Sequence, residues 1–380
     1  MNSFKVLNLY SGNLYGGIEA MLVTMARSFN TLPGITMEFG LCFPGRLKQE
    51  LVEAGATVHD LGSVRLRYPW TGMLANNRLR KVLDTHRYDA VITHACWPHA
   101  IFSDSVRRSG MPLVFWQHDL ASGQSRLDRT AARTKPDLVI SNSQYTANTL
   151  TNLFPNTPNA VIYTPLPPYG QGTPSESERA KIRDEFQAHP EDVVIVHAAR
   201  MESWKGHRLL LDALALLRDQ PRWKLWIVGG TQRDHEVAYL QSLRKQAEDT
   251  GIADRVSFLG QRNDVRLLLS VADIHCQPNI SPEPLGLVYV EALYAGLPLV
   301  TTALGGASEI INNQCGIRVP AADRVELSNA LRLLITNPVL RKQLGAAGPA
   351  RAEELCDPGR VLLKLQDLCL PLRAQHTTTR

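Results

Sequence analysis

Two glutamates eight residues apart stand out in the second half of the chain. They are Glu283 and Glu291, and Pro284 suits the first position of a helix that would connect them. At about 1.5 Å per residue, the two carboxylates would lie roughly 12 Å apart along the helix axis. The paired carboxylates of glycosidases are closer, at about 5 to 9.5 Å, so a hydrolase pair is excluded. The spacing favours two carboxylates that hold the ends of an elongated ligand, with the amides of Gly286 and Leu287 between them at the positive end of the helix.

Each glutamate alone has a simpler explanation. A helix dipole favours a carboxylate such as Glu283 near the start of a helix, and Glu291 alone would be an ordinary surface residue. Their combination with Gly286, which leaves room for a ligand beside the backbone, favours a binding site. Other residues of the predicted helix form an apolar stripe that should face a sheet, namely Leu285, Val288, Tyr289, Ala292 and Leu293.

Two cations form a second candidate site. Arg200 and Lys205 follow the apolar run at residues 193–197, which predicts a strand. Ligands of doubly wound sheets bind outside the carboxyl ends of the strands, so both side chains would lie where a diphosphate can bind. They would neutralise the charge of a departing diphosphate, which would make a divalent metal unnecessary. On this segment alone, two solvated loop cations are an equally good interpretation.

A glycine-rich turn follows the first predicted strand. Gly16 and Gly17 come after the run at residues 5–10, and glycines there allow backbone amides to approach a phosphate. Glycines also occur at such positions simply to make a turn. The segment is not G-x-G-x-x-G, and no well-placed acidic residue follows a second strand. A dinucleotide cofactor is therefore disfavoured.

A histidine follows another strand of the first half. His118 lies just past the run at residues 113–116, where its imidazole would reach a ligand at that edge of the sheet. His94 and His99, after the run at residues 90–93, are weaker candidates of the same kind. A lone histidine is more often a structural residue, which is the alternative for all three.

Short apolar runs alternate with amphipathic segments along the chain, a pattern typical of parallel strands linked by helices. In the first half they are residues 5–10, 37–42, 90–93, 113–116, 138–141 and 160–163. In the second half they are residues 193–197, 224–228, 256–259, 274–276 and 299–301. Residues 154–175 between the two series are rich in Pro, Asn and Gly and predict a domain linker. We therefore expect an α/β protein with two doubly wound parallel sheets.

Length and composition agree with a globular protein of two domains. The chain has 380 residues, which is more than one hydrophobic core usually supports. Its six cysteines are scattered without C-x-x-C or metal-ligand spacing, so we expect reduced core residues. No apolar stretch reaches the roughly 18 residues of a membrane span, and the chain begins with a strand pattern. We expect a cytoplasmic protein.

The net charge of +5 originates in the first half, where residues 1–170 hold 16 Lys and Arg against 11 Asp and Glu. Part of this excess surrounds Tyr68, Pro69 and Trp70, in the form of Arg65, Arg67, Arg78, Arg80 and Lys81. This group would suit peripheral contact with an anionic membrane surface or an acidic acceptor, although a solvated helix and loop is the commoner case. Nucleic acid is not an expected partner, because no binding motif accompanies so modest a charge.

In combination, these motifs resemble those of the retaining GT-B glycosyltransferases of the group 1 type, in glycosyltransferase family four. The resemblance covers nearly the whole chain and is strongest over residues 193–311. Its carriers are Gly16-Gly17, Arg200 with Lys205-Gly206, Phe258-Leu-Gly260, the Glu-x7-Glu signature of Glu283 and Glu291, Ala295-Gly-Leu-Pro298 and Gly305-Gly306-x-x-Glu309. Ala199 departs from the family, which often has Gly before the Arg, and residues 116–119 match its histidine segment only loosely.

The resemblance implies a GT-B fold, in which two Rossmann-like domains with doubly wound parallel sheets face a central cleft. Residues 1–168 would form the acceptor-binding domain and residues 169–357 the nucleotide-sugar donor domain. Residues 358–380 would form a helix that returns to the first domain.

The resemblance also implies roles for the candidate residues. Glu291 would bind the donor ribose, and Glu283 would hold the hydroxyls of the transferred sugar. Arg200 and Lys205 would bind the diphosphate. The backbone amides of Gly16, Gly17, Gly286 and Leu287 would assist them, and His118 would line the sugar site from the other domain.

The implied activity is transfer of a hexose-type sugar from a nucleotide diphosphate sugar, with UDP favoured over GDP. Saccharide, lipid-linked and small-molecule acceptors all remain open, as does the oligomeric state. The departing phosphate would accept the acceptor's proton on a front-face path that retains the anomeric configuration. No metal and no cofactor beyond the donor sugar nucleotide is expected.

Other functions remain as alternatives. They are a nucleotide-sugar epimerase or a sugar phosphorylase of the same fold, a non-catalytic nucleotide-sugar binding protein and, last, a dehydrogenase. An epimerase needs acidic and basic groups aimed at one sugar carbon, whereas the candidate residues would hold a whole donor.

Overall fold

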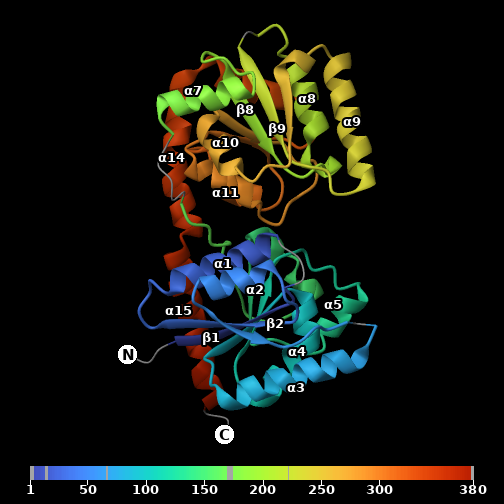
Figure 1. The fold of residues 1–380 in the computed structure, drawn as a ribbon, viewed down its shortest axis with the longest axis vertical. Coiled ribbons are helices and arrows are strands. Elements are labelled where there is room, and N and C mark those ends of the chain that lie inside the picture. Colours follow the sequence, from blue (N-terminus) through green and yellow to red (C-terminus); the bar gives the residue numbers. More distant parts are fainter. Residues whose placement is uncertain (1–3, 13–15, 66, 169–173, 221, 378–380) are drawn as a thin grey trace. The chain divides into compact units, whose positions relative to one another are not determined.

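The computed structural model of the chain describes residues 4–12, 16–65, 67–168, 174–220 and 222–377. Its internal contacts divide it into two compact units, Met1–Pro167 with Cys356–Arg380 and Pro168–Leu355. We call these unit 1 and unit 2. Each unit contains a parallel sheet with helices on both faces (Figure 1).

Unit 1 is built on a seven-stranded sheet in the order β3-β2-β1-β4-β5-β6-β7. Its strands are β1 (Phe4–Tyr10), β2 (Ile35–Leu41), β3 (Thr57–Asp60), β4 (Ala90–His94), β5 (Leu113–Gln117), β6 (Leu138–Ser141) and β7 (Asn159–Val161). All neighbouring pairs are parallel. The chain first moves outward through β2 and β3 and then fills the other side from β4 onward. The order reverses between β1 and β4, which is where doubly wound sheets open a crevice for ligands.

The helices of unit 1 are α1 (Gly17–Phe29), α2 (Arg46–Glu53), α3 (Pro69–Thr85), α4 (Cys96–Ser109), α5 (Arg126–Ala131), α6 (Gln144–Ala147), the 3₁₀ turn η1 (Leu150–Asn152) and the C-terminal α15 (Pro358–Thr377). The helix α15 lies against α1 (Figure 1) and contributes Val361, Leu362 and Leu365 to the buried core of this unit. Near its start, the carboxylate of Asp357 accepts a hydrogen bond of 2.8 Å from the amide of Arg360.

Unit 2 is built on a six-stranded parallel sheet in the order β10-β9-β8-β11-β12-β13. Its strands are β8 (Val193–Ala198), β9 (Trp223–Val228), β10 (Val256–Gly260), β11 (Ile274–Gln277), β12 (Leu299–Thr302) and β13 (Gly316–Val319). The side chains of β8, β11 and β12 are buried along their whole length. Burial on both faces explains the unbroken apolar run of Val193–Val196 in β8.

The helices of unit 2 are α7 (Glu176–Glu185), α8 (His207–Ala215), α9 (Asp234–Asp249), α10 (Val265–Val271), α11 (Leu287–Tyr294), α12 (Ala307–Ile310), α13 (Arg324–Thr336) and α14 (Pro338–Cys356), with the 3₁₀ turns η2 (Ser203–Lys205) and η3 (Ala253–Arg255). Asp323 caps α13, since its side chain accepts hydrogen bonds from the amides of Val325 and Glu326 at 2.9 and 3.0 Å.

The predicted α/β fold with two doubly wound parallel sheets is confirmed, and every predicted apolar run overlaps a strand, although the runs at residues 37–42 and 160–163 extend past the ends of β2 and β7. Two strands were not predicted, β3 and β13, and both lie at a sheet edge. All six cysteines are free, and five of them are buried.

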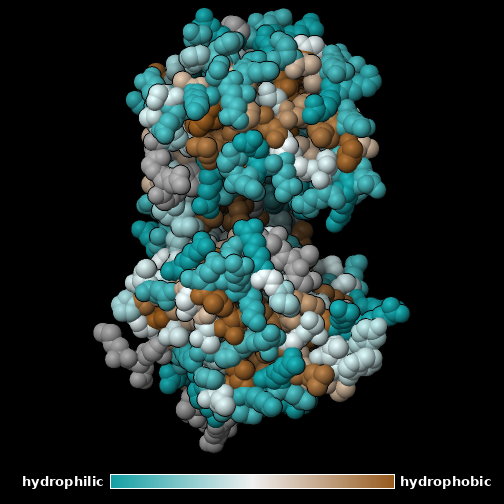
Figure 2. All heavy atoms as spheres, viewed as in Figure 1, coloured by the Kyte–Doolittle hydropathy of each residue, from teal (hydrophilic) through white to brown (hydrophobic). Residues whose placement is uncertain are grey.

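The face of the molecule in Figure 2 is largely hydrophilic, and its hydrophobic residues form small separate patches. The start of α3 is an exception to the usual burial of large apolar side chains, because Trp70, Met73 and Leu74 are 55%, 62% and 55% exposed. Across the described residues, every helix is too short or too polar to cross a membrane.

Candidate functional site

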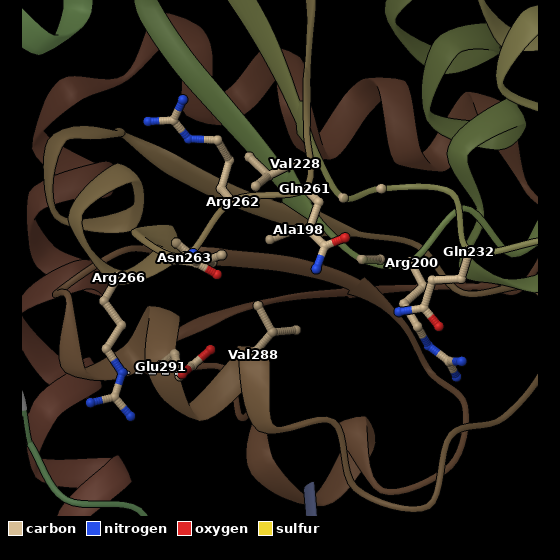
Figure 3. Close-up of a pocket in the computed structure, with 14 residues that line it drawn as sticks. Ala198, Arg200, Val228, Gln232, Gln261, Arg262, Asn263, Arg266, Val288 and Glu291 are labelled. Carbon is tan, nitrogen blue, oxygen red and sulfur yellow. Dashed lines mark hydrogen bonds and ion pairs between the residues drawn. The ribbon is translucent and has the colours of Figure 1, made fainter. Parts of the chain in front are cut away.

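Unit 2 contains a pocket of about 440 Å³ at the carboxyl ends of β8, β9 and β10 (Figure 3). This is the edge at which doubly wound sheets bind ligands. Both Arg200, just after β8, and Glu291, in α11, line it. The other lining residues are Ala198, Ala199, Val228, Gly229, Gly230, Gln232, Gln261, Arg262, Asn263, Val265, Arg266 and Val288. Two of the predicted site residues, one cationic and one anionic, therefore share one pocket.

Glu291 lies at the α10 side of this pocket. Its Oε1 is 3.2 Å from Nε of Arg266, and its side chain is 21% exposed. Burial raises the pKa of Glu291, while the charge and hydrogen bond of Arg266 act in the opposite direction. The carboxylate accepts hydrogen bonds in its charged form, which suits it to the hydroxyl groups of a sugar or ribose.

Arg200 lies on the other side of the pocket from Glu291 (Figure 3). Its side chain is 55% exposed, and Nη2 is 3.0 Å from the carboxylate of Glu202. A surface ion pair of this kind holds its partners weakly. The guanidinium can therefore exchange Glu202 for a phosphate at small cost.

Lys205 and Glu283 form an ion pair that sequence reasoning did not anticipate. Nζ of Lys205 is 2.6 Å from Oε1 of Glu283, and the two side chains are 9% and 15% exposed. The second oxygen of Glu283 accepts hydrogen bonds from Asn279 at 2.9 Å and Gln277 at 3.3 Å. The ammonium also lies 4.0 Å from the ring centre of Trp204. Both candidate residues are thus held in a fixed position, next to one another.

The segment before α11 differs from the prediction. We expected Pro284 at the first helical position, but the helix begins at Leu287 and Gly286 is its N-cap, with φ of 84°. The estimate of 12 Å between Glu283 and Glu291 assumed helix from the first to the second, so it does not apply. What the structure shows is that Glu291 lines the pocket whereas Glu283 is not among the lining residues.

Close backbone contacts explain why the helix starts late. The amide of Gly306 donates a 2.8 Å hydrogen bond to the carbonyl of Glu283. A Cβ at Gly305 would come within 2.4 Å of the same carbonyl, and one at Gly286 within 2.5 Å of the Tyr289 ring. The Gly305-Gly306 turn therefore packs directly on the backbone of Glu283 and holds it outside the helix.

The apolar stripe predicted for α11 is correct in part. Tyr289, Ala292 and Leu293 are buried, and the hydroxyl of Tyr289 donates to the carbonyl of Gln277 at 3.2 Å. Val288 instead lines the pocket. Because the first amides of a helix lack intrahelical partners, Gly286 and Leu287 lie where such amides point outward.

In unit 1, Gly16 is the N-cap of α1 and Gly17 its first residue. The Gly16 amide donates a 2.9 Å hydrogen bond to the carboxylate of Glu19, which also accepts one of 2.9 Å from the Tyr10 hydroxyl. The predicted phosphate contact of the Gly16 amide would therefore have to replace Glu19. Residues 13–15, also part of the predicted turn, lie outside the described residues.

His118 follows β5 directly and is 7% exposed. Its Nε2 is 3.1 Å from Nδ1 of His94, whose Nε2 is 3.0 Å from Oδ1 of Asn8. The ring also stacks near Trp116, with 5.9 Å between centroids. Burial lowers the pKa of His118 to about 3, so the imidazole is neutral at physiological pH.

His99, the weaker candidate on α4, has a structural role. Its Nδ1 is 2.7 Å from the hydroxyl of Thr93, and Nε2 is 2.8 Å from the carbonyl of Thr134. Both ring nitrogens are satisfied inside the unit. The structural alternative given for a lone histidine therefore holds for His99.

Sequence reasoning missed several polar residues beside the predicted ones. They are Arg266 and Asn263 in the pocket, Gln277 and Asn279 at Glu283, and Asn8 beside His94. Asn263 and Arg266 follow β10 in the sequence, but Asn263 lies in the segment before α10 and Arg266 on the helix, so the pair has no periodic spacing that would indicate a site. No described group of three or more His, Cys, Asp or Glu side chains has an arrangement that would hold a metal ion.

Comparison with protein families gives two matches that together span most of the chain. The model for glycosyl transferases group 1 matches residues 178–351, and the model for glycosyltransferase family 4 matches residues 15–168. The first match includes Arg200, Lys205, Glu283 and Glu291. The second includes Gly16, Gly17 and His118.

Among curated proteins, the chain is similar to mannosyltransferases. It is 30% identical to the GDP-mannose-dependent alpha-(1-6)-phosphatidylinositol monomannoside mannosyltransferase of Mycolicibacterium smegmatis, over 77% of this chain and 82% of that protein. It is 27% identical to the GDP-mannose-dependent monoacylated counterpart of Corynebacterium glutamicum, over 80% of this chain and 83% of that protein.

Among solved structures, the chain resembles Anabaena HepE in complex with UDP, with a TM-score of 0.81 and 25% identity over 96% of this chain and 99% of that chain. HepE has also been solved with UDP-glucose, at a TM-score of 0.78. A glycosyltransferase from Rickettsia africae has a TM-score of 0.84 over all of both chains, and its 17% identity makes this a likeness of fold.

Proposed function

Because the chain belongs to the group 1 glycosyltransferases of GT-B fold, we propose that it is a retaining, metal-independent hexosyltransferase whose donor is a UDP-sugar. The observation that carries this proposal is the pocket of unit 2, in which Arg200 and Glu291 lie on different sides at the carboxyl ends of the strands. The ribose of a nucleoside diphosphate carries a diol that suits the carboxylate of Glu291, and the neighbouring diphosphate carries negative charge that suits the guanidinium of Arg200.

The proposed roles follow from the contacts. Glu291, held by Arg266, accepts hydrogen bonds from the ribose hydroxyls, and Arg200 binds the diphosphate. Lys205 lies against Glu283, so the cation at the leaving group and the carboxylate at the transferred sugar are neighbours. The first amides of α11, from Gly286 and Leu287, add positive helix-terminal dipoles to the phosphate side. For Gly16, Gly17 and His118 of unit 1, the roles that the family resemblance implies are part of the same proposal.

The metal-independent mechanism rests on the two cations assigned to the diphosphate, of which Arg200 lines the pocket and Lys205 pairs with Glu283. Charge develops on the diphosphate as the glycosidic bond breaks, and Arg200 and Lys205 stabilise it in place of a divalent ion. The departing phosphate oxygen then accepts the proton of the acceptor hydroxyl on the same face of the sugar. This path needs no separate general base and retains the anomeric configuration.

The side chains around the pocket support uracil as the base. The Watson–Crick edge of guanine presents adjacent N–H donors, which suit a carboxylate acceptor. Of the described lining residues, Glu291 alone has a carboxylate, and Arg266 contacts it. The amides of Gln261 and Asn263 both donate and accept, as the alternating edge of uracil requires. The guanidinium of Arg262 points away from the pocket centre (Figure 3), where it pairs with Asp264 at 2.6 Å.

The comparisons are divided on this point, so the base needs a direct test. The mycobacterial and corynebacterial relatives are named for GDP-mannose, whereas HepE, which covers more of this chain, was solved with UDP and UDP-glucose. We would measure thermal stabilisation by UDP, GDP, ADP and NAD, since a ligand of the native state raises the melting temperature (Tm). UDP should stabilise the protein most, and Lys205→Ala should weaken its effect. Stronger stabilisation by GDP would show that the proposed base is wrong.

A substitution in the pocket sharpens this test. Asn263→Asp introduces a carboxylate where guanine would pair, so the affinity for GDP relative to UDP should rise about tenfold. Asn329→Asp makes the same charge change on the exposed face of α13 and serves as the matched control. An unchanged ratio in Asn263→Asp would remove Asn263 from the base site.

The exposed start of α3 bears on the acceptor. Trp70, Met73 and Leu74 are more than half exposed, and Arg67 and Arg78, a few residues away in the chain, are exposed as well. Apolar side chains beside arginines suit the interface of an anionic lipid surface. We propose that unit 1 contacts such a surface peripherally and receives a lipid-linked acceptor there, as the names of the phosphatidylinositol relatives suggest. Vesicles with anionic lipid should bind the wild type, and Trp70→Ser with Met73→Ser should abolish this binding; equal binding to neutral vesicles would contradict it.

A further inference from the structure

Three side chains from the central strands of unit 1 form a buried hydrogen-bonded line that ends at His118. Asn8 comes from β1, His94 ends β4, and His118 follows β5. Asn8 and His94 are 0% exposed and His118 is 7% exposed. The two links are 3.0 Å from Asn8 Oδ1 to His94 Nε2 and 3.1 Å from His94 Nδ1 to His118 Nε2.

The orientation of Asn8 fixes the protons along this line. Its Nδ2 lies 3.5 Å from the backbone carbonyl of Glu38, and a carbonyl can only accept. The amide oxygen of Asn8 therefore faces His94, and Nε2 of His94 must carry a proton. In a neutral imidazole the other nitrogen is then an acceptor, so His94 Nδ1 accepts from Nε2–H of His118.

The charge state of the pair supports the same assignment. Burial lowers the pKa of His94 well below its ordinary value, and so does the neighbouring His118. Two neutral rings joined by one N–H···N bond have a single arrangement that satisfies Asn8. In that arrangement Nδ1 of His118 carries a lone pair and no proton.

We propose that Asn8 and His94 are positioning residues that hold His118 as the Nε2–H tautomer, so that its Nδ1 accepts a hydrogen bond from a hydroxyl of the bound sugar. The tautomer follows from unit 1 alone, and the hydroxyl partner depends on the proposed function. A protonated or Nδ1–H histidine would instead donate at this position. Such a donor suits a phosphate oxygen better than a sugar hydroxyl, which needs an acceptor for its proton.

The tautomer can be measured on the unliganded full-length protein by NMR of ¹⁵N-labelled histidine. We expect a protonated Nε2 for both rings and a through-hydrogen-bond ¹⁵N–¹⁵N coupling between His118 Nε2 and His94 Nδ1. Signals are assigned by their loss in His118→Gln, and His99→Gln, a buried histidine outside the line, should leave them in place. A proton on Nδ1 of either His94 or His118 would overturn the proposal. This outcome does not depend on any activity.

Two substitutions at His94 separate positioning from packing. His94→Phe keeps the flat ring beside Trp116 and removes the acceptor, so kcat should fall about tenfold while stabilisation by UDP stays unchanged. His94→Asn places an amide oxygen near the former Nδ1 and should recover most of this loss. Equal impairment of the two variants would mean that His94 only fills space, and wild-type kcat in His94→Phe would remove it from the line.

Asn8 provides the second pair of variants, should His94→Phe not fold. Asn8→Asp keeps an acceptor for His94 Nε2 and should preserve the coupling between the two rings. Asn8→Leu removes that acceptor and should abolish the coupling and lower kcat by a similar factor. If coupling and kcat survive in Asn8→Leu, the line does not set the tautomer of His118. The wild type could also show the coupling between the two rings yet transfer no sugar from any UDP donor. That result would refute the proposed function and leave the tautomer assignment intact.

Discussion

The Lys205–Glu283 pair allows a quantitative prediction. Removing one partner of a buried ion pair costs about 3–5 kcal/mol, because the other charge is left uncompensated. Here the Nζ–Oε1 distance is 2.6 Å, but the side chains retain 9% and 15% exposure, and Glu283 keeps hydrogen bonds from Asn279 and Gln277. We therefore expect Lys205→Met to lower the free energy of unfolding by about 2 kcal/mol, below the range for a fully buried pair.

Glu283→Gln should cost less, about 1 kcal/mol, because its amide oxygen can still accept from Lys205. In the double variant both charges are absent, so the loss should be smaller than the sum of the single losses. The coupling energy from the double-mutant cycle should be about 1–2 kcal/mol. A loss of about 2 kcal/mol corresponds to a decrease in Tm of roughly 4–8 °C for a unit of this size.

Calorimetry on the wild type, both single variants and the double variant measures this cycle. Lys245→Met is the matched control, because Lys245 pairs with Asp249 at 3.0 Å on the exposed face of α9, where both side chains are more than half exposed. This control should change Tm by no more than about 1–2 °C. If Lys205→Met and Glu283→Gln are additive within about 0.5 kcal/mol, the pair is absent in solution and its assigned geometry is refuted.

Four further predictions concern the donor site, the metal requirement and acid stability. Arg200→Ala should weaken UDP binding about tenfold and lower turnover, whereas Arg208→Ala on α8 should not; wild-type UDP affinity would remove Arg200 from the site. Glu283→Gln should leave UDP affinity unchanged but reduce sugar transfer, and an equal loss of affinity and transfer would contradict its assigned role. The wild type should be fully active in EDTA, and inactivation by the chelator would contradict the metal-independent mechanism. Burial disfavours the charged form of Glu38, but the hydrogen bonds of its carboxylate, led by the one to Lys5, together have a larger effect. They lower the pKa of Glu38 from 4.5 to about 2. The folded state therefore binds the proton less well than the unfolded chain. The charged Glu38 carboxylate therefore stabilises the folded state fully above pH 4.5, and this contribution is lost as the pH falls toward 2. Tm should fall over that window, and Glu38→Gln should make the fall less steep.

The central strands could be predicted from the sequence because both of their faces are buried. β4 and β5 consist of buried residues alone, and each begins with an apolar run, residues 90–92 in β4 and residues 113–116 in β5. β3 was missed because it is an edge strand whose residues, Thr57–Asp60, are all exposed or half-buried. β13 was missed for a similar reason, since Arg318 is exposed within its four residues. An edge strand is hydrogen-bonded to a single neighbouring strand and is partly exposed, so its sequence need not be apolar.

The start of α11 shows where local sequence rules fail. Pro284 satisfies the rule for a first helical residue, and nothing nearby argues against it. The competing contact comes from Gly305 and Gly306, which pack on the backbone of Glu283 about twenty residues earlier. A tertiary contact between two glycines and a carbonyl has no periodicity, so a sequence pattern does not indicate it.

The same limit applies to the site, where it changes the chemical interpretation. Residue types and order sufficed to select Lys205 and Glu283, but they suggested that the two side chains bind separate parts of the donor. In the structure the two side chains, 78 positions apart in the chain, share one short contact. A diphosphate that attracts the ammonium of Lys205 therefore competes with Glu283 for it. With the proposed roles, capture of the ammonium by the diphosphate and release of the Glu283 carboxylate at the sugar are one coupled event, and the energy of the double-mutant cycle sets its scale.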